Sequence, residues 1–268
     1  YDWNRIKIEN IPAALDEGLR LAKLKLAKLE ALPLKDASYE TFFVPFEYLA
    51  EELSRAWSLC DHFANLCDCP QIRQIQEKYT PLITEFFALI TQNSALYERA
   101  QAVAASPSFK KLNALQRRLV SESLRGFKHG GAALPTEKKS ELLQIKKQLS
   151  LLTQKYSQFT LDALNAYEKL IPLSEAAATL KGLPPSALSM AQLSAEKSGK
   201  PGFYRFTLHQ PSLEAVLLYA ENRPLREELW RSFNGLCVEG PFATENLISE
   251  ILELRERLAK IIGYENFS

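Results

Sequence analysis

The stretch Thr136–Tyr167, TEKKSELLQIKKQLSLLTQKYSQFTLDALNAY, carries an uninterrupted helical pattern. Its apolar residues recur every three or four positions, at Leu142, Ile145, Leu149, Leu152, Tyr156, Phe159, Ala163 and Tyr167. This spacing predicts one long amphipathic helix with a single apolar stripe. Leu134-Pro135-Thr136 opens it, because a proline is tolerated where a helix begins.

The same periodicity recurs on both sides of this stretch. A first helix is expected near residues 11–31, closed by Pro33. Three further stripes are Phe46, Leu49, Leu53, Trp57, Cys60, Ala64 and Cys67; then Ile72, Ile75, Tyr79, Leu82, Phe86 and Leu89; and finally Leu247, Ile251, Leu254, Leu258 and Ile261. The sequence therefore predicts an all-α fold of long antiparallel helices, with well over half of the chain helical.

Glycine and proline mark the expected helix ends. Lys128-His129-Gly130-Gly131 has the order of a helix C-terminus, with basic residues in the last turn and glycine after it. Three prolines are typical of the first turn of short helices: Pro184, Pro211 and Pro224. Pro81 falls inside a periodic run and is expected to kink that helix.

One segment departs from the helical pattern. Phe203–Leu208 is short and aromatic and lies between Gly202 and Pro211, which favours a β-strand. A lone strand is not stable, so this one needs a partner. No second strand is evident in the sequence.

Composition limits the possible functions. The 268 residues contain 33 Lys and Arg against 32 Asp and Glu, a net charge of +1, which argues against a protein built to neutralise phosphates. Only 10 residues are glycine, which disfavours all-β and nucleotide-cradling folds. No apolar run is long enough to cross a membrane. The polar start Tyr1–Asn4 lacks a signal peptide and an initiator methionine, so further residues are expected before it.

The chain has four cysteines, which are Cys60, Cys67, Cys69 and Cys237. Four are too few for a disulfide scaffold, so a reducing, cytosolic setting is expected. Cys67-Asp68-Cys69 resembles a metal-binding or redox pair. However, Cys60 and Cys67 share the apolar stripe of their helix, and free cysteine is often buried. Both are therefore predicted to be reduced and buried, with metal binding and redox switching as the alternatives.

No complete active site is evident in the sequence. The three histidines are far apart, and we expect structural roles for them: His62 packed beside a buried stripe, His129 at a helix end, and His209 where the strand ends. A zinc hydrolase usually needs two such ligands and a carboxylate. The acidic pairs are typical of solvated helix faces: Glu51-Glu52, Glu227-Glu228 and Glu250/Glu253. We therefore assign no catalytic, cofactor-binding or metal-binding residue within this chain.

An ordered series of short segments runs along the chain. It consists of Asn93-Ser94-Ala95-Leu96-Tyr97, Gln116-Arg117-Arg118, Leu124-Arg125-Gly126-Phe127, Gly131-Ala132-Ala133-Leu134-Pro135, Leu149 with Tyr156-Ser157, Leu161-Asp162-Ala163, Gly202–Leu208, Arg226-Glu227-Glu228-Leu229, Ile251-Leu252-Glu253-Leu254-Arg255 and Leu258–Phe267. In order and spacing this series resembles the N-terminal part of the oligopeptidase A / thimet oligopeptidase family of zinc metallopeptidases, and Trp57 and His62 match a helix of that family.

The resemblance implies that the catalytic residues lie in a different part of the protein from the helical region present here. The family's chemistry resides in a His-Glu-x-x-His helix and a distal glutamate, and this sequence has no matching residues. Residues 1–268 are then the N-terminal helical part of a larger cytoplasmic oligopeptidase that cleaves short peptides. Its zinc domain is expected beyond Ser268, where the chain looks truncated. The part present here is expected to help form a substrate channel, to bind no zinc and to be inactive alone.

Two other readings follow from the bare residues. An α-helical scaffold or binding protein without catalysis is the main alternative to the peptidase region. Nucleic-acid binding is disfavoured by the net charge and by the even spread of Lys and Arg. The C-terminal aromatics Tyr264 and Phe267 are expected to pack either on this chain's own core or on the missing catalytic half.

Overall fold

The computed structural model describes residues 6–268, so the polar start Tyr1–Asn4 lies outside the described residues. It divides into two compact units, which are residues 6–151 with 253–268 (unit 1) and residues 152–252 (unit 2). Helices make up well over half of the chain, and the only sheet in the described part has two strands. The predicted mainly α fold is confirmed. None of the described helices is both long enough and apolar enough to cross a membrane.

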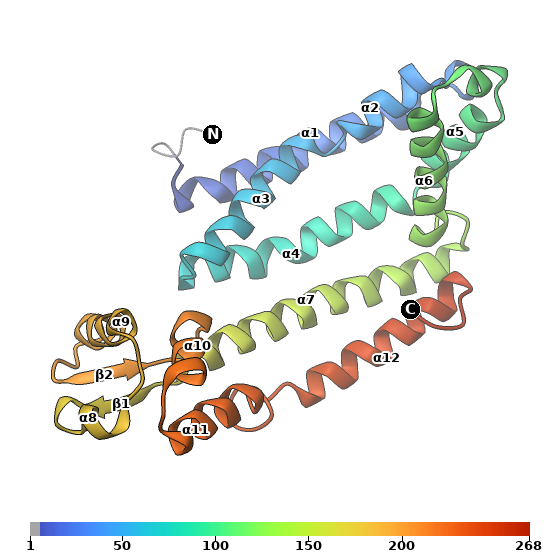
Figure 1. Cartoon of the computed structure of the whole chain (residues 1–268). Coiled ribbons are helices and arrows are strands. Elements are labelled where there is room, and N and C mark those ends of the chain that lie inside the picture. The colour runs from blue at the N-terminus through green and yellow to red at the C-terminus, as the bar shows by residue number, and fades with distance from the viewer. Residues whose placement is uncertain (1–5) are drawn as a thin grey trace. The chain divides into compact units, whose positions relative to one another are not determined.

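Unit 1 consists of helices. Its elements are α1 (Ile11–Ala31), α2 (Val44–Glu47), α3 (Glu51–Leu66), α4 (Pro70–Thr91), α5 (Ser94–Ala105), α6 (Ala114–Gly130), the first half of α7 (Thr136–Ala166) and the end of α12 (Glu245–Ile262). The helices α1, α3 and α4 lie side by side and alternate in direction, and α5 and α6 form a second antiparallel pair (Figure 1). A single apolar core joins α1 through α6.

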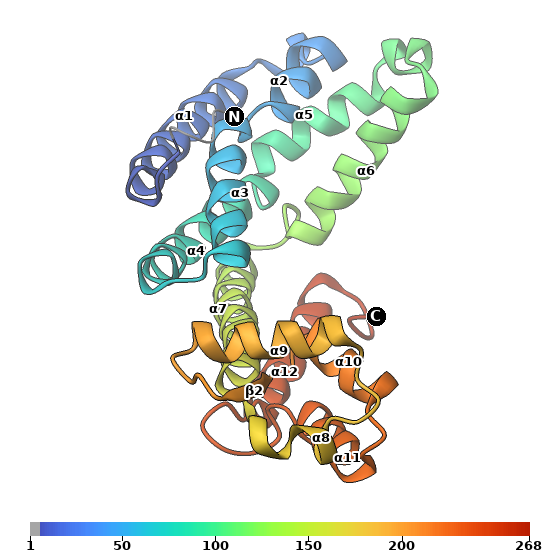
Figure 2. The same ribbon diagram turned by 60° about the vertical axis from the view of Figure 1, so that its left-hand side comes forward.

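Unit 2 combines short helices with the sheet. It contains the second half of α7, β1 (Lys169–Pro172), α8 (Ala176–Thr179), α9 (Pro185–Lys197), β2 (Phe203–Phe206), α10 (Gln210–Tyr219), α11 (Arg223–Asn234) and the start of α12. The helix α9 packs against β2 and also contacts α10 (Figure 2). The strand predicted at Phe203–Leu208 is thus present over its first four residues.

The partner of β2 is the strand that the sequence did not reveal. β1 pairs with β2 in antiparallel register, with Lys169 opposite Phe206 and Pro172 opposite Phe203. The segment is only four residues long and directly follows the longest helix, so it shows no alternation of its own. The predicted need of β2 for a partner is therefore met by a segment with no evident strand signal in the sequence.

Several predicted helix ends are confirmed. The first helix has the predicted bounds, and α6 ends at Gly130, after which Gly131 takes the left-handed conformation with φ 96°. The prolines stand at or just before the starts of their helices: Pro184 caps α9, and Pro211 and Pro224 occupy the first turns of α10 and α11. Pro81 lies inside α4, as expected.

Three of the predicted stripes are wrong in part. In α4, Leu82 and Leu89 are exposed, and their neighbours Ile83 and Ile90 are buried instead. The buried face runs through Tyr79, Ile83, Phe86 and Ile90. Steps of three and of four residues both stay on one helix face, and the predicted stripe took steps of three at the two positions where the helix buries the residue four positions on. In α7, Leu142 and Ile145 are buried but Tyr156 is exposed. The stripe that begins at Phe46 also crosses a break, because α2 ends at Glu47 and α3 begins at Glu51.

Cys60 is buried as predicted, whereas Cys67 is exposed. The reason is that α3 ends at Leu66, and Cys67 has φ −134° and ψ 39°, which removes it from the helical face that carries Cys60. Burial, together with the charge of Asp61, raises the pKa of the Cys60 thiol to about 12. Both cysteines are free thiols.

Arg99 connects the end of α1 to α5. Its guanidinium is buried and donates to three backbone carbonyls: Leu32 at 2.6 Å, Ala95 at 2.7 Å and Glu30 at 2.5 Å. The last carbonyls of any helix lack partners within the helix. Arg99 therefore stabilises the C-terminal end of α1 where the chain turns away.

The C-terminal aromatics are each about half exposed, at 51% for both Tyr264 and Phe267. The Tyr264 hydroxyl lies 2.6 Å from Nε2 of His129, and the ring of Phe267 lies 5.2 Å below the guanidinium of Arg255. Tyr264 thus contacts unit 1 through its hydroxyl and Phe267 through the face of its ring, and neither ring is covered by the core.

The contact between α1 and α3 provides a stability test. A Cβ atom on Gly18 would lie 2.8 Å from the Cα atom of Leu53, whereas one on Gly126 would meet nothing within 4 Å. We expect Gly18→Ala to lower the free energy of unfolding by roughly 1–3 kcal/mol through overpacking. Gly126→Ala, the matched control within α6, should raise it by about 0.5–1 kcal/mol. Urea unfolding of both variants measures the difference, and a Gly18→Ala protein as stable as the parent would contradict the close contact.

The cysteines provide a second test. A thiol reagent should modify Cys67 rapidly in the native protein, because it is exposed, and should reach Cys60 only after unfolding. Tandem mass spectrometry of the tryptic peptide 56–73, which contains both cysteines and Cys69, identifies from its fragments the site modified at each time. In the control, Cys67→Ser should remove the fast phase; a fast phase that persists would place the exposed thiol elsewhere.

Candidate functional site

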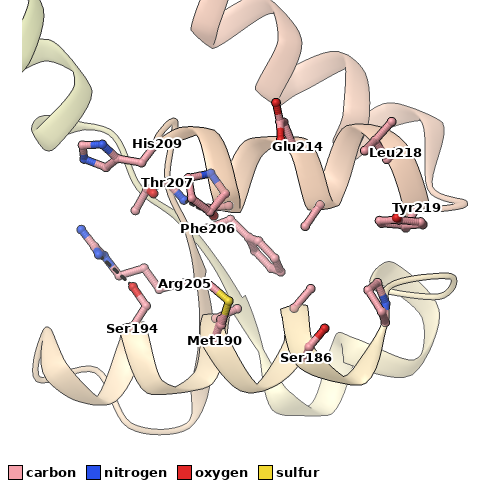
Figure 3. Close-up of a pocket in the computed structure, with 16 residues that line it drawn as sticks. Ser186, Met190, Ser194, Arg205, Phe206, Thr207, His209, Glu214, Leu218 and Tyr219 are labelled. Carbon is pink, nitrogen blue, oxygen red and sulfur yellow. Dashed lines mark hydrogen bonds between the residues drawn. The ribbon is translucent and has the colours of Figure 1, made fainter.

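Unit 2 contains a groove of about 710 Å³ between α9 and α10, and we call it the α9–α10 groove. Figure 3 shows Ser186, Met190 and Ser194 on one helix and Glu214, Leu218 and Tyr219 on the facing helix, with Phe206 between them. Arg205, Phe206 and Thr207 of the β2 segment line its floor. The groove thus has two helical walls and a strand as its base.

Local sequence explains why the walls form where they do. Pro184 and Pro185 begin α9, and Pro211 begins α10. Ala191 on α9 is buried against the core of unit 2, and its small side chain lets the helix lie close to β2. The larger Met190 beside it remains 57% exposed on the groove side.

The floor of the groove carries the positive charge of Arg205, which an ion pair with Glu168 neutralises. Arg205 Nε donates to Glu168 Oε2 at 3.0 Å, and its Nη1 donates to Ser194 Oγ at 3.1 Å. Lys200 donates to the other oxygen of Glu168. Hydrogen bonds from Lys200 and Arg205 hold the pKa of the Glu168 carboxyl below its usual value. The ion pairs fix the Arg205 side chain at one end of the groove.

The exposed part of the α10 wall of the groove is mainly apolar. Leu218 is 70% exposed and Tyr219 is 54% exposed, although both are large side chains on a short helix. Concave, mostly apolar sites with a few fixed polar groups are typical places for ligands. The groove can therefore hold a small or extended ligand, and its polar lining includes His209 and Glu214.

Each histidine of the sequence has a separate place. His209 is exposed and caps α10, with Nε2 3.1 Å from Asn165 Oδ1, so it leaves the strand as predicted. His129 lies in the last turn of α6, also as predicted. His62 is exposed on α3 and not packed beside the core as expected, because it faces away from the buried side that carries Cys60.

The Cys67-Asp68-Cys69 pair is not assembled as a ligand set. Asp68 accepts a hydrogen bond from Arg73 Nε at 2.8 Å, and that bond holds the pKa of the carboxyl below its usual value. Among residues 6–268, no group of three or more His, Cys, Asp and Glu side chains is placed to hold a metal ion.

The acidic pairs lie on helix surfaces, as the sequence predicts. Their ion-pair partners are Arg55 for Glu51, Lys25 for Glu52, Arg231 for Glu227 and Lys169 for Glu228. The acidic groups at Glu250 and Glu253 are exposed. None of these pairs converges on the groove.

Sequence reasoning did not find the α9–α10 groove. The only hints were the aromatic strand and the prolines that begin α9 and α10. Which side chains line the groove depends on how the two helices pack around β2, and no periodic pattern encodes that.

Comparison with known proteins identifies the family. Residues 17–139 match the family model described as Neurolysin/Thimet oligopeptidase, N-terminal domain. Oligopeptidase A of Haemophilus influenzae is 33% identical over 271 residues, which cover 99% of this chain and 39% of the relative. Oligopeptidase A of Escherichia coli is 31% identical over 273 residues, with the same coverage of 99% and 39%.

A plant relative extends the match. The probable cytosolic oligopeptidase A of Arabidopsis thaliana is 31% identical over 259 residues, covering 94% of this chain and 36% of the relative. The chain thus spans less than half the length of the curated relatives it matches. The chain therefore belongs to the oligopeptidase A / thimet oligopeptidase family and corresponds to its N-terminal part.

Proposed function

We propose that residues 1–268 are the N-terminal helical region of a larger, zinc-dependent oligopeptidase that cleaves short peptides. The observation that carries this proposal is the match of 99% of the chain to 39% of oligopeptidase A. A match of that kind assigns the chain to one region of a peptidase. We propose that the larger part of the relatives, which this chain does not match, supplies the reacting groups.

Zinc does not fit the residues described here. No cluster of three or more potential ligands exists among them, His129 bonds to Tyr264, and His209 lies beside Asn165. A catalytic zinc site needs three protein ligands and an open position. We therefore place the zinc ligands in the part of the relatives that this chain does not match, and assign this chain no catalytic step.

The role proposed for the chain is to form part of a substrate channel. A peptidase that acts on short peptides must keep folded proteins away from its reacting groups. Long helices with few glycines make a stiff wall, because each backbone amide is bonded within its own helix. The helices α1, α4 and α7 have that character, with 21, 22 and 31 residues. A cytosolic location is proposed by analogy with the plant relative, whose name states it.

A non-catalytic scaffold remains the second candidate. Unit 2 exposes large apolar side chains outside the groove as well, including Trp230 at 53% and Val238 at 61%. Exposed apolar surface of this kind suits contact with another protein. The same side chains would suit contact with a catalytic region. The reading frame of the gene and the activity of the chain therefore have to distinguish the peptidase region from the scaffold.

The gene provides the first test. A reading frame that continues past Ser268 and encodes His-Glu-x-x-His about 200 residues later supports the peptidase region. A natural stop codon at Ser268 supports the scaffold.

Chemistry provides the second test. The 268-residue chain should leave a quenched-fluorescence octapeptide uncut and should carry no stoichiometric zinc by elemental analysis, because it lacks a ligand set. The longer protein from the same gene is the positive control and should cleave the peptide and lose activity with a chelator. Cleavage by the 268-residue chain with one bound zinc would contradict the proposed division of labour.

A further inference from the structure

One edge of the two-stranded sheet is open, and the register identifies which atoms it presents. The Leu173 N–H donates to the Gly202 carbonyl at 3.0 Å, and these two residues continue the register of the strands. In an antiparallel pair, hydrogen-bonded and non-hydrogen-bonded positions alternate. Tyr204 and Phe206 therefore direct their N–H and C=O groups to β1, whereas Phe203 and Arg205 direct theirs away.

The position of Pro172 agrees with this register. Proline has no N–H, and Pro172 lies opposite Phe203 at a position where no hydrogen bond to β2 is made. Continuing the alternation beyond the strand, Thr207 also directs its N–H away from β1. That N–H donates to Ser212 Oγ at 3.0 Å.

This bond establishes where the open edge points. Ser212 lines the α9–α10 groove, so the outward edge of β2 faces into the groove at its Thr207 end. Three consecutive residues, Arg205, Phe206 and Thr207, line the groove. Side chains alternate along a strand, so consecutive lining residues are expected when a cavity follows the edge of the strand.

The outward backbone groups of Phe203 and Arg205 have no partner among the described residues. No hydrogen bond joins either N–H or C=O to any of residues 6–268. Thr207 is the exception on this edge, because Ser212 occupies its N–H. An unpaired strand edge presents a template for an added strand.

We propose that the α9–α10 groove binds a short, extended peptide as a third strand on the open edge of β2. The peptide backbone would exchange hydrogen bonds with the outward N–H and C=O groups of Arg205, the residue of this edge that lines the groove and has both groups unpaired. This is recognition by strand addition, in which main-chain bonds provide affinity and side-chain pockets provide specificity.

The lining defines the chemistry of the peptide. Met190, Leu218 and Tyr219 present exposed apolar surface to the groove. Arg205, the nearest cation, is already paired with Glu168. The preferred peptide therefore has apolar or β-branched side chains at alternating positions, and its binding should depend little on salt.

The inference rests on the proposed function only in the choice of a short peptide as occupant. The groove lies wholly within unit 2 and needs no zinc. A failure of binding would overturn the groove proposal and leave the reading-frame and zinc tests of the proposed function unaffected.

The test uses fluorescence anisotropy with the 268-residue chain and a fluorescein-labelled hexapeptide of alternating valine and threonine. Arg205→Pro removes the outward N–H without removing a bond to β1, because residue 205 makes none there. Arg205→Ala is the matched control, since it removes the same side chain and its ion pair but keeps the N–H. We expect Arg205→Pro to bind about tenfold more weakly than Arg205→Ala, the loss that corresponds to about one backbone hydrogen bond.

Two further measurements keep the result independent of folding. Circular dichroism and thermal melting show whether both variants retain the parent's helices. The same hexapeptide with every backbone nitrogen methylated should lose binding to the unaltered chain by about tenfold or more, because it cannot donate to the strand edge. Absence of binding by the parent, equal affinities of the two variants, or equal binding of the methylated peptide would each overturn the proposal.

Discussion

The pairing of backbone polar groups is the constraint on which the arrangement of this protein depends. Inside a helix the pairing is automatic, but at each end several groups are left without partners. The guanidinium of Arg99 meets that need at the C-terminal end of α1 by donating to three carbonyls, two of which belong to Glu30 and Leu32. One buried side chain of α5 thereby fixes where the first helix stops and how the chain leaves it.

Two helices can approach each other closely only where the side chains between them are small. Glycine is scarce in this sequence, yet Gly18 stands where α1 meets the backbone of α3 at Leu53. A larger residue there would push the two helices apart and disturb the core that both line. The stiffness expected of a channel wall thus depends on a few small residues as well as on long helices.

The sheet of unit 2 is the place where the pairing is incomplete. Its strand β2 is bonded on one side to β1. On the other side, within residues 6–268, the outward groups of Phe203 and Arg205 have no partner, and the N–H of Thr207, just after the strand, is bonded to Ser212. The open groups lie beside an apolar groove between two helices that begin at prolines. Under the proposed function this region would bind peptides without reacting with them, and the incomplete edge is the part of its backbone suited to do so.

The sequence by itself determined the helical class, the bounds of α1 and the end of α6, because period, proline and glycine act locally. It also determined the family, through segments spread along the whole chain. Tertiary structure alone decided the rest. Ile83 is buried in place of Leu82, Cys67 leaves the helical face of Cys60, and Arg99 reaches the end of α1. Each of these three outcomes depends on which neighbouring element packs against a given side of the helix. The groove and the open edge of β2 depend on the strand that Lys169–Pro172 forms, which has no periodic signal, and on its register with β2, which is set by packing between residues more than thirty positions apart.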